Sequence, residues 1–331
     1  MMRYFCTYFD HRFLPRALAL IESLRSWCPE FRLWALCLDE AGYDAMHRLS
    51  LPNVELISLA ELERRDLELL TVKESRSRVE YYFTCTPSLP LHVLRHSPEV
   101  ELITYLDADL FFFADPEPLF AQLGDGSVGI IPHRFSRRVA DRARFGTYNV
   151  GWISFRRDED GMACLRWWRD RCLEWCYARV EGDRYADQKY LDQWPSRFRN
   201  VRVLEHKGAN LGPWNLASYR VTERDGRVWV DDEPLLFFHF SSFQRVAPWL
   251  YNTNLSSWHV RPYTTVRRRV VGPYISVLER LRYPAAAPGP AERRADEGLA
   301  ARLQRKLRAI GRIVGGLLAQ DHLVVLRGRV L

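Results

Sequence analysis

The sequence predicts an α/β protein with a central, mostly parallel sheet flanked by helices. Three observations support this prediction. Apolar runs typical of buried strands alternate with helical patterns from the first residues onward. The chain has 331 residues, enough for one large α/β domain or two small ones. Its composition, with 47% hydrophobic and 27% charged residues, is that of a folded globular protein.

The first part of the chain has a β-α-β-α-β pattern. An apolar strand over residues 4–9 precedes a helix over 14–27, whose apolar residues recur at helical spacing. A strand over 31–38, a short helix ending at Leu49 and a strand over 53–59 follow. This order predicts a nucleotide-binding half with a parallel sheet.

The later elements are expected in less regular order. They are a helix over 75–94, strands over 102–106, 128–131, 150–155 and 201–204, a Trp-rich helix over 161–180, a hairpin at Asp225-Gly226 and an apolar run over 235–240. We expect the main domain to span residues 1–283. Residues 284–298, rich in Pro, Ala and Gly, have the composition of a linker.

The net charge of +7 is concentrated near the C-terminus. Residues 261–282 hold six arginines and one glutamate, and residues 291–331 hold nine basic and four acidic residues. The first 260 residues are therefore mildly acidic, which argues against a nucleic-acid-binding face and against nucleic acid as a partner. Residues 299–331 form a basic amphipathic tail. Two interpretations stay open for it: a helix on an anionic membrane surface, or a helix docked on the body.

The expected location is the cytoplasm, with contact at the inner face of the membrane through the tail. The segment from Met1 to Cys6 lacks the long apolar stretch of a signal peptide, and no window approaches the roughly 18 apolar residues of a membrane span. The seven cysteines are expected to be reduced thiols. Three of them, Cys164, Cys172 and Cys176, share the Trp-rich helix, and we expect them to pack in the core.

Asp107-Ala108-Asp109 is the most informative motif. It follows the apolar run Leu102–Leu106, and ligands of open α/β sheets bind outside the carboxyl ends of the strands. Two carboxylates one residue apart at such an edge suit a divalent cation that keeps open positions for phosphate oxygens. The motif resembles the Asp-x-Asp element of GT-A-fold glycosyltransferases, a Rossmann-like nucleotide-diphospho-sugar transferase fold.

A second motif strengthens this resemblance. His239, with Ser242, Arg245 and Pro248-Trp249 after it, is similar to the late His-x-x-Gly-x-x-Lys-Pro-Trp element of family-8-like retaining glycosyltransferases of bacterial surface polysaccharide synthesis. There the His completes the metal site and the Lys contacts the diphosphate. The resemblance implies a site of Asp107, Asp109 and His239. It also implies Mn²⁺, with Mg²⁺ as an alternative, and a diphosphate contact from Arg245, whose fork suits phosphate. Ser242 departs from the pattern and puts the loop geometry in question.

The resemblance also implies residues for the donor and the acceptor. Asp187 and Gln188 would lie near the anomeric carbon, and Asn149 and Gly151 would line the sugar pocket. Lys207, Asn210 and Trp214 belong to a loop suited to sugar recognition. Thr7, Tyr8 and Asp10 would lie at the nucleobase and ribose, and Arg78, slightly favoured over Arg76, at donor sugar or phosphate. Structural alternatives stay open: a turn at Asn149, a helix cap at Asp187, a buried Trp214 and solvated arginines.

Taken together, the motifs predict a metal-dependent, retaining glycosyltransferase that moves a hexose from a UDP-sugar to a glycan or lipid-linked hydroxyl acceptor in surface-glycan synthesis. A non-catalytic nucleotide-sugar or glycan-binding protein is the first alternative, although such a protein would not need a metal beside a phosphate-binding Arg. A haloacid-dehalogenase-type phosphatase is the second. Its motif needs Thr or Val where this chain has Phe111. A nucleotidyltransferase would carry a Gly-rich loop after the first strand, and residues 10–15 contain no glycine.

Overall fold

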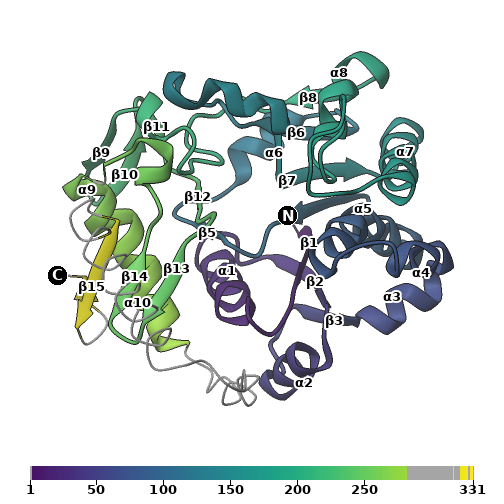
Figure 1. The fold of residues 1–331 in the computed structure, drawn as a ribbon, viewed down its shortest axis with the longest axis horizontal. Helices are drawn as coiled ribbons and strands as arrows, with labels where there is room; N and C mark the ends of the chain where they lie inside the picture. Colours follow the sequence, from purple (N-terminus) through teal and green to yellow (C-terminus); the bar gives the residue numbers. More distant parts are fainter. Residues whose placement is uncertain (1, 262, 282–315, 317–320, 327–328, 331) are drawn as a thin grey trace, which may run out of the picture.

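A seven-stranded sheet in the order β3-β2-β1-β4-β7-β6-β8 forms the centre of the molecule (Figure 1). The computed structural model describes residues 2–261, 263–281, 316, 321–326 and 329–330. Strands β3, β2, β1 and β4 run parallel, β8 is parallel to β6, and β7 is antiparallel to both β4 and β6. The mostly parallel, mixed sheet predicted from the sequence is thus confirmed. Its strands are β1 (Arg3–Phe9), β2 (Phe31–Cys37), β3 (Val54–Ser58), β4 (Leu102–Leu106), β6 (Val128–Pro132), β7 (Tyr148–Arg156) and β8 (Val201–Val203).

Helices cover both faces of this sheet because successive strand residues point to opposite sides. Phe5 and Leu33 pack in one core cluster with α1 (Leu14–Trp27), α2 (Glu40–Leu49) and α6 (Glu117–Leu123). Cys6 and Trp34, one residue further along each strand, pack in a second cluster on the other face. The helices of that face are α3 (Leu59–Arg65), α4 (Leu67–Lys73), α5 (Arg78–His96) and α7 (Glu159–Glu174).

Short strands and helices from the second half of the chain pack around a third core cluster. Strand β12 (Phe237–His239) pairs with β5 (Leu110–Phe112), and this pairing ties the second half to the segment that follows β4. The other strands are β9 (Val221–Arg224), β10 (Arg227–Val230), β11 (Glu233–Pro234), β13 (Gln244–Ala247) and β14 (Leu250–Asn252). The helices of this part are α9 (Thr264–Val266), α10 (Gly272–Arg280), the 3-10 helices η3 (Leu216–Ser218) and η4 (Ser256–Trp258), and the π-helical turn η5 (Arg267–Val271). Two further short helices, η2 (Lys189–Gln193) and α8 (Trp194–Arg197), pack in the second cluster, and the 3-10 helix η1 (Arg137–Phe145) precedes β7.

The end of the chain returns to this second half. Strand β15 (His322–Leu326) pairs antiparallel with β14, and β16 (Arg329–Val330) pairs with β15 (Figure 1). The predicted linker over 284–298 and the apolar helical stripe between Leu299 and Leu318 lie outside the described residues. Within the part of the chain that the structure describes, we find no helix with the length and apolar character needed to cross a membrane.

The Trp-rich helix α7 differs from its predicted range of 161–180. It begins at Glu159 because the Asp158 carboxylate caps it, accepting a hydrogen bond from the Gly161 N–H (2.8 Å). It ends at Glu174 because Trp175 adopts an extended conformation, with φ −154° and ψ 118°. The apolar pattern continues past this point, so the sequence alone suggested a longer helix. The three cysteines expected in the core, Cys164, Cys172 and Cys176, are all buried.

Candidate active site at the carboxyl edge of the sheet

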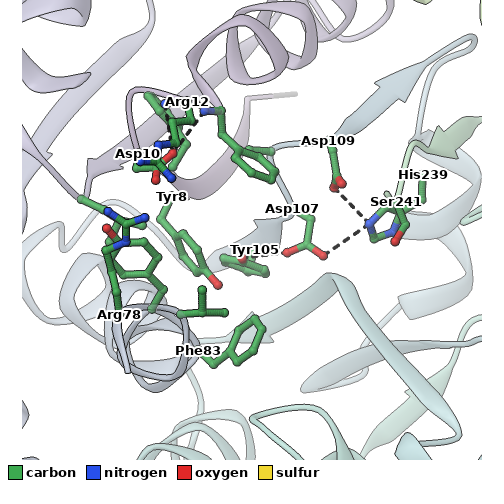
Figure 2. A pocket seen from close by; sticks show the side chains of 16 residues that line it. Tyr8, Asp10, Arg12, Arg78, Phe83, Tyr105, Asp107, Asp109, His239 and Ser241 are labelled. Carbon is green, nitrogen blue, oxygen red and sulfur yellow. Dashed lines mark hydrogen bonds and ion pairs between the residues drawn. The ribbon is translucent and has the colours of Figure 1, made fainter. Parts of the chain in front are cut away.

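Two carboxylates and an imidazole converge at the carboxyl end of β4 (Figure 2). Asp107 and Asp109 follow β4 directly, and His239 is the last residue of β12. The β5–β12 pairing places His239 opposite Leu110, the residue after Asp109. His239 Nε2 therefore lies 3.0 Å from Asp109 Oδ1 and 3.6 Å from Asp107 Oδ2. One possible ligand atom from each of the three residues lies within 4.8 Å of the other two.

The electrostatics of this triad favour a positive charge between its members. Burial acts against ionisation of Asp109, yet the neighbouring His239 and Arg16 hold the pKa of Asp109 below its usual value. Burial likewise opposes the imidazolium, but Asp109 and Asp107 raise the pKa of His239 overall. The donor set of two carboxylate oxygens and one imidazole nitrogen fits Mn²⁺ well and accommodates Mg²⁺ less well.

Neighbouring side chains orient the three members of the triad. The Tyr105 hydroxyl donates to Asp107 Oδ1 (2.8 Å). His239 Nδ1 lies 3.2 Å from Asn210 Oδ1, so the Nδ1–H donates to this amide oxygen and Nε2 faces the carboxylates. The Trp214 ring packs edge-on against the imidazole, with centroids 5.0 Å apart. Such outer contacts fix the ring orientation that a metal ligand needs.

Two cavities of about 440 Å³ each meet at this triad. The first cavity lies between the ends of β1 and β4 and the start of α5, and it is lined by the predicted residues Tyr8, Asp10, Arg78, Asp107 and Asp109 (Figure 2). The second cavity extends past β7 and contains the predicted residues Asn149, Asp187, Gln188 and Trp214. Both cavities share the residues Tyr8, Phe83, Asp107, His239 and Ser241.

Asp187 is held in an unusual environment in the second cavity. It is 5% exposed, and burial together with the nearby Asp107 charge raises its pKa to about 7, although a hydrogen bond with Thr86 acts in the opposite direction. Its backbone carbonyl accepts a hydrogen bond from Trp168 Nε1 (2.8 Å). Ala186 before it has φ +46°, a left-handed conformation that is uncommon for alanine and is often found at functional sites.

Comparisons with known proteins show the family to which the chain belongs. No family model matches the chain. The chain is 32% identical over 281 residues to the uncharacterized protein YfnD of Bacillus subtilis (strain 168), covering 84% of this chain and 89% of YfnD. It is 36% identical over 251 residues to the uncharacterized protein YfnF of the same strain, covering 73% of this chain and 82% of YfnF. This chain belongs to the family of YfnD and YfnF.

A solved structure identifies the fold. The galactosyltransferase LgtC, crystallised with donor and acceptor sugar analogs, matches with a TM-score of 0.51 and 15% identity over 85% of this chain and 96% of LgtC. The chain has the GT-A fold. The fold inferred from Asp107-x-Asp109 and His239 is therefore confirmed.

Several predicted site residues lie outside the two cavities. Thr7 is buried within β1, and its hydroxyl has no hydrogen-bond partner among the described residues. Lys207 Nζ is bound to Asp232 Oδ1 (2.6 Å). Arg245 Nη2 donates to the Pro248 carbonyl (3.1 Å), and its Nε lies 3.6 Å from Glu279. Arg76 is buried under Tyr177, with its guanidinium 4.0 Å from that ring. These acidic and aromatic partners come from distant segments, which explains why the sequence did not indicate them.

Ser242, which replaces the glycine of the family pattern, keeps the backbone conformation that glycine favours. Its φ is +61°, in the left-handed region. The loop after His239 therefore tolerates the substitution in its present path. Serine in place of glycine at this position costs about 1 kcal/mol of backbone conformational free energy and does not require a different loop.

The sequence did not point to four further residues of the site. Arg12 lines the first cavity, and His133, Arg142 and Trp258 line the second. His133 Nε2 accepts a hydrogen bond from Asn149 Nδ2 (3.1 Å), and burial lowers the pKa of His133 to about 3, so this imidazole is neutral. Arg12 comes two residues after Asp10 at the end of β1, and this position is the only hint the sequence gives. The other three come from loops and 3-10 helices without a regular pattern.

Gly151 is needed because the imidazole of His239 packs directly on its backbone. A Cβ at this position would lie 2.8 Å from His239 Nδ1 and 2.6 Å from Asn149 Oδ1. Because Trp214 and Asn210 hold the ring from other sides, we expect Gly151→Ala to displace the imidazole and weaken Mn²⁺ binding about tenfold or more. Calorimetric titration with Mn²⁺ measures this loss.

The matched control is Gly226→Asn in the hairpin between β9 and β10. Nothing lies within 4 Å of a Cβ at Gly226, and asparagine tolerates its φ of +75°. Unchanged Mn²⁺ affinity in Gly151→Ala would show that the imidazole is not held as described.

Proposed function

We propose that this protein transfers a hexose from a UDP-sugar to a hydroxyl group of a glycan or lipid-linked acceptor, with Mn²⁺ as cofactor. The observation that carries the proposal is the placement of the triad Asp107, Asp109 and His239 at the junction of two cavities. A nucleotide in the first cavity and a sugar in the second would have their connecting diphosphate at this junction. The GT-A fold is consistent with this use.

The first cavity suits a nucleoside diphosphate. Arg12 and Arg78 bring positive charge to its wall, and Asp10 is available to bind hydroxyl or base N–H groups. Aromatic side chains, including Phe13 and Tyr82, supply apolar area for a base. A divalent cation bound by the triad would neutralise the two negative charges that develop on the departing diphosphate.

The polar groups that line the second cavity suit a sugar ring. Asn149 Oδ1 accepts a hydrogen bond from the Gly151 N–H (2.9 Å), and its Nδ2 donates to His133, which leaves one amide N–H for a sugar hydroxyl. Gln188 Nε2 donates to the Phe145 carbonyl (3.0 Å), which leaves its amide oxygen for a contact with the donor sugar. Asp187 would accept hydrogen bonds from hydroxyls of the donor sugar. A diphosphate leaving group does not require a protein acid, so the proposed role of Asn149, Gln188 and Asp187 is to bind and orient the donor sugar.

Retention of the anomeric configuration is part of the proposal and is supported by the resemblance of the motifs to family-8-like enzymes. The configuration of the product, read from the anomeric proton coupling in an NMR spectrum, tests it. A role in surface-glycan synthesis at the inner face of the membrane completes the proposal. Sedimentation of the full chain with anionic liposomes, compared with neutral ones, tests the membrane contact.

The experiment that tests the activity is a screen of nucleotide sugars with and without Mn²⁺. We expect thermal stabilisation by UDP and UDP-sugars only in the presence of the metal, followed by slow release of free UDP. Stabilisation without any UDP release, even with a mixture of sugar acceptors, would favour the non-catalytic sugar-binding alternative. Absence of metal-dependent stabilisation by all nucleotides would refute the proposal.

A further inference from the structure

The second cavity contains a cationic side chain that the reaction described above does not use. Arg142 of η1 is the one Arg or Lys among the residues that line this cavity. The imidazole of His133 is neutral, as shown above, and His239 belongs to the metal triad. Among the described residues, Arg142 is therefore the only permanent cation that lines the second cavity.

The guanidinium of Arg142 has no acidic partner among the described residues. Its Nη2 lies 3.5 Å from the Ser257 carbonyl, a weak contact, and its central carbon lies 4.2 Å from the centroid of the Trp258 ring. Lys207, in contrast, is neutralised by Asp232. Stacking on Trp258 fixes the plane of the Arg142 fork while leaving its N–H groups able to bind a planar anion in two-point fashion.

Two tryptophan rings connect Arg142 to the imidazole of the metal triad. Arg142 contacts the Trp258 ring, and the Trp258 ring packs against Trp214, with centroids 6.1 Å apart. The Trp214 ring in turn packs against His239. Asp187, in contrast, is close enough to Asp107 for their charges to interact. The diphosphate would lie at the triad, so Arg142 faces a different part of the bound sugars.

We infer that a sugar bound in the second cavity carries an anionic substituent, a carboxylate or a phosphate, which Arg142 binds. This inference rests on the proposed function and adds to it the chemical class of the substrate. The substituent can belong to the transferred sugar, as in a nucleotide-linked uronic acid, or to the acceptor sugar. The chemistry at Arg142 is the same in both cases.

The test uses pairs of ligands that differ in one anionic group, in two arms. In the donor arm, UDP-glucuronic acid is compared with UDP-glucose in the presence of Mn²⁺. In the acceptor arm, glucuronate and glucose 6-phosphate are compared with glucose on protein that already holds Mn²⁺ and UDP. Dissociation constants are measured by calorimetry for the wild type and for Arg142→Gln, Arg142→Lys and Arg138→Gln. Arg138 is an exposed arginine of η1 that does not line the cavity.

We expect the wild type to bind the anionic member of a pair at least tenfold more tightly than the neutral one in one arm. Arg142→Gln should remove this preference, so that the ratio of the two dissociation constants falls to about one. Arg142→Lys should keep part of it, and Arg138→Gln all of it. The arm that shows the preference identifies the sugar that carries the substituent.

Two outcomes would overturn the inference. One is equal binding of anionic and neutral ligands by the wild type in both arms. The other is a preference that persists in Arg142→Gln. A failure of the proposed function is recognised separately, because UDP would then give no Mn²⁺-dependent binding in any of the four proteins. Unchanged unfolding temperatures of the variants confirm that the differences arise in the cavity.

Discussion

Replacing Asp109 with asparagine should lower the rate of UDP-sugar turnover by about 100- to 1,000-fold and remove the dependence of this rate on Mn²⁺. Asp109 makes the closest approach to His239 within the triad, at 3.0 Å, and it is the member whose pKa the surrounding charges hold low. An amide of the same shape keeps an oxygen ligand but loses the negative charge. The cation would then contribute less of the several kcal/mol by which a metal stabilises a departing diphosphate.

Two measurements check this expectation. The rate of UDP release is followed over a range of Mn²⁺ concentrations, and the Mn²⁺ dissociation constant is determined by calorimetry in the absence of any sugar. The matched control is Asp125→Asn, because Asp125 has a side chain 92% exposed and pairs only with Arg202 at the surface. Wild-type Mn²⁺ dependence in Asp109→Asn would show that the triad does not hold the catalytic cation.

The first half of the fold follows from local patterns in the sequence. The β-α-β-α-β order needs only the alternation of buried strands and amphipathic helices, and the strand before Asp107 identifies itself by its apolar run. The carboxyl ends of parallel strands lie at one edge of the sheet, so the Asp-x-Asp pair that follows one of these strands lies at this edge. His239 is different, because its place depends on the pairing of β12 with β5, two apolar segments more than a hundred residues apart.

The second cavity could be predicted only in part. Asn149, Asp187 and Gln188 are implied by the resemblance, and all three line this cavity. Arg142 and Trp258 could not be predicted, since the polar sequence of η1 fits an exposed loop and its orientation depends on packing against η4. Lys207 shows the opposite difficulty. Its loop is rich in sugar-binding residue types, but Asp232 draws its side chain to the surface.

The carboxyl group of Asp187 connects the stability of the protein to its function. Its pKa of about 7 in the folded protein lies above the usual value of 3.8 that applies in the unfolded chain. Between these pH values the folded state keeps a proton that the unfolded state has lost, so this group makes the folded state less stable as the pH rises from about 4 to about 7. Above pH 7 the full cost of a buried carboxylate is present.

Asp187→Asn should therefore be more stable than the wild type at pH 8, by about 1 to 4 kcal/mol, and nearly as stable as the wild type at pH 4.5. The asparagine amide is neutral at both pH values, and its oxygen can still accept a hydrogen bond from Thr86. The same change should reduce transfer activity strongly, since the carboxylate is the group proposed to bind the donor hydroxyls. A bound Mn²⁺ ion should narrow the stability difference, because a cation near Asp107 favours the ionised form of Asp187 as well.

Urea unfolding of the wild type and Asp187→Asn at pH 4.5 and pH 8, with and without Mn²⁺, measures the expected changes in stability. The rate of UDP release measures the loss of activity. Asp183→Asn is the control, because Asp183 is exposed, belongs to the same segment and contacts Gln193 alone among the described residues. Its stability should equal that of the wild type at both pH values. If Asp187→Asn gains no stability at pH 8, or gains the same amount at pH 4.5, the buried carboxylate does not bear the cost assigned to it. A gain confined to high pH, together with lost activity, would mean that the fold accepts a destabilising charge at Asp187 because the chemistry of the site requires it.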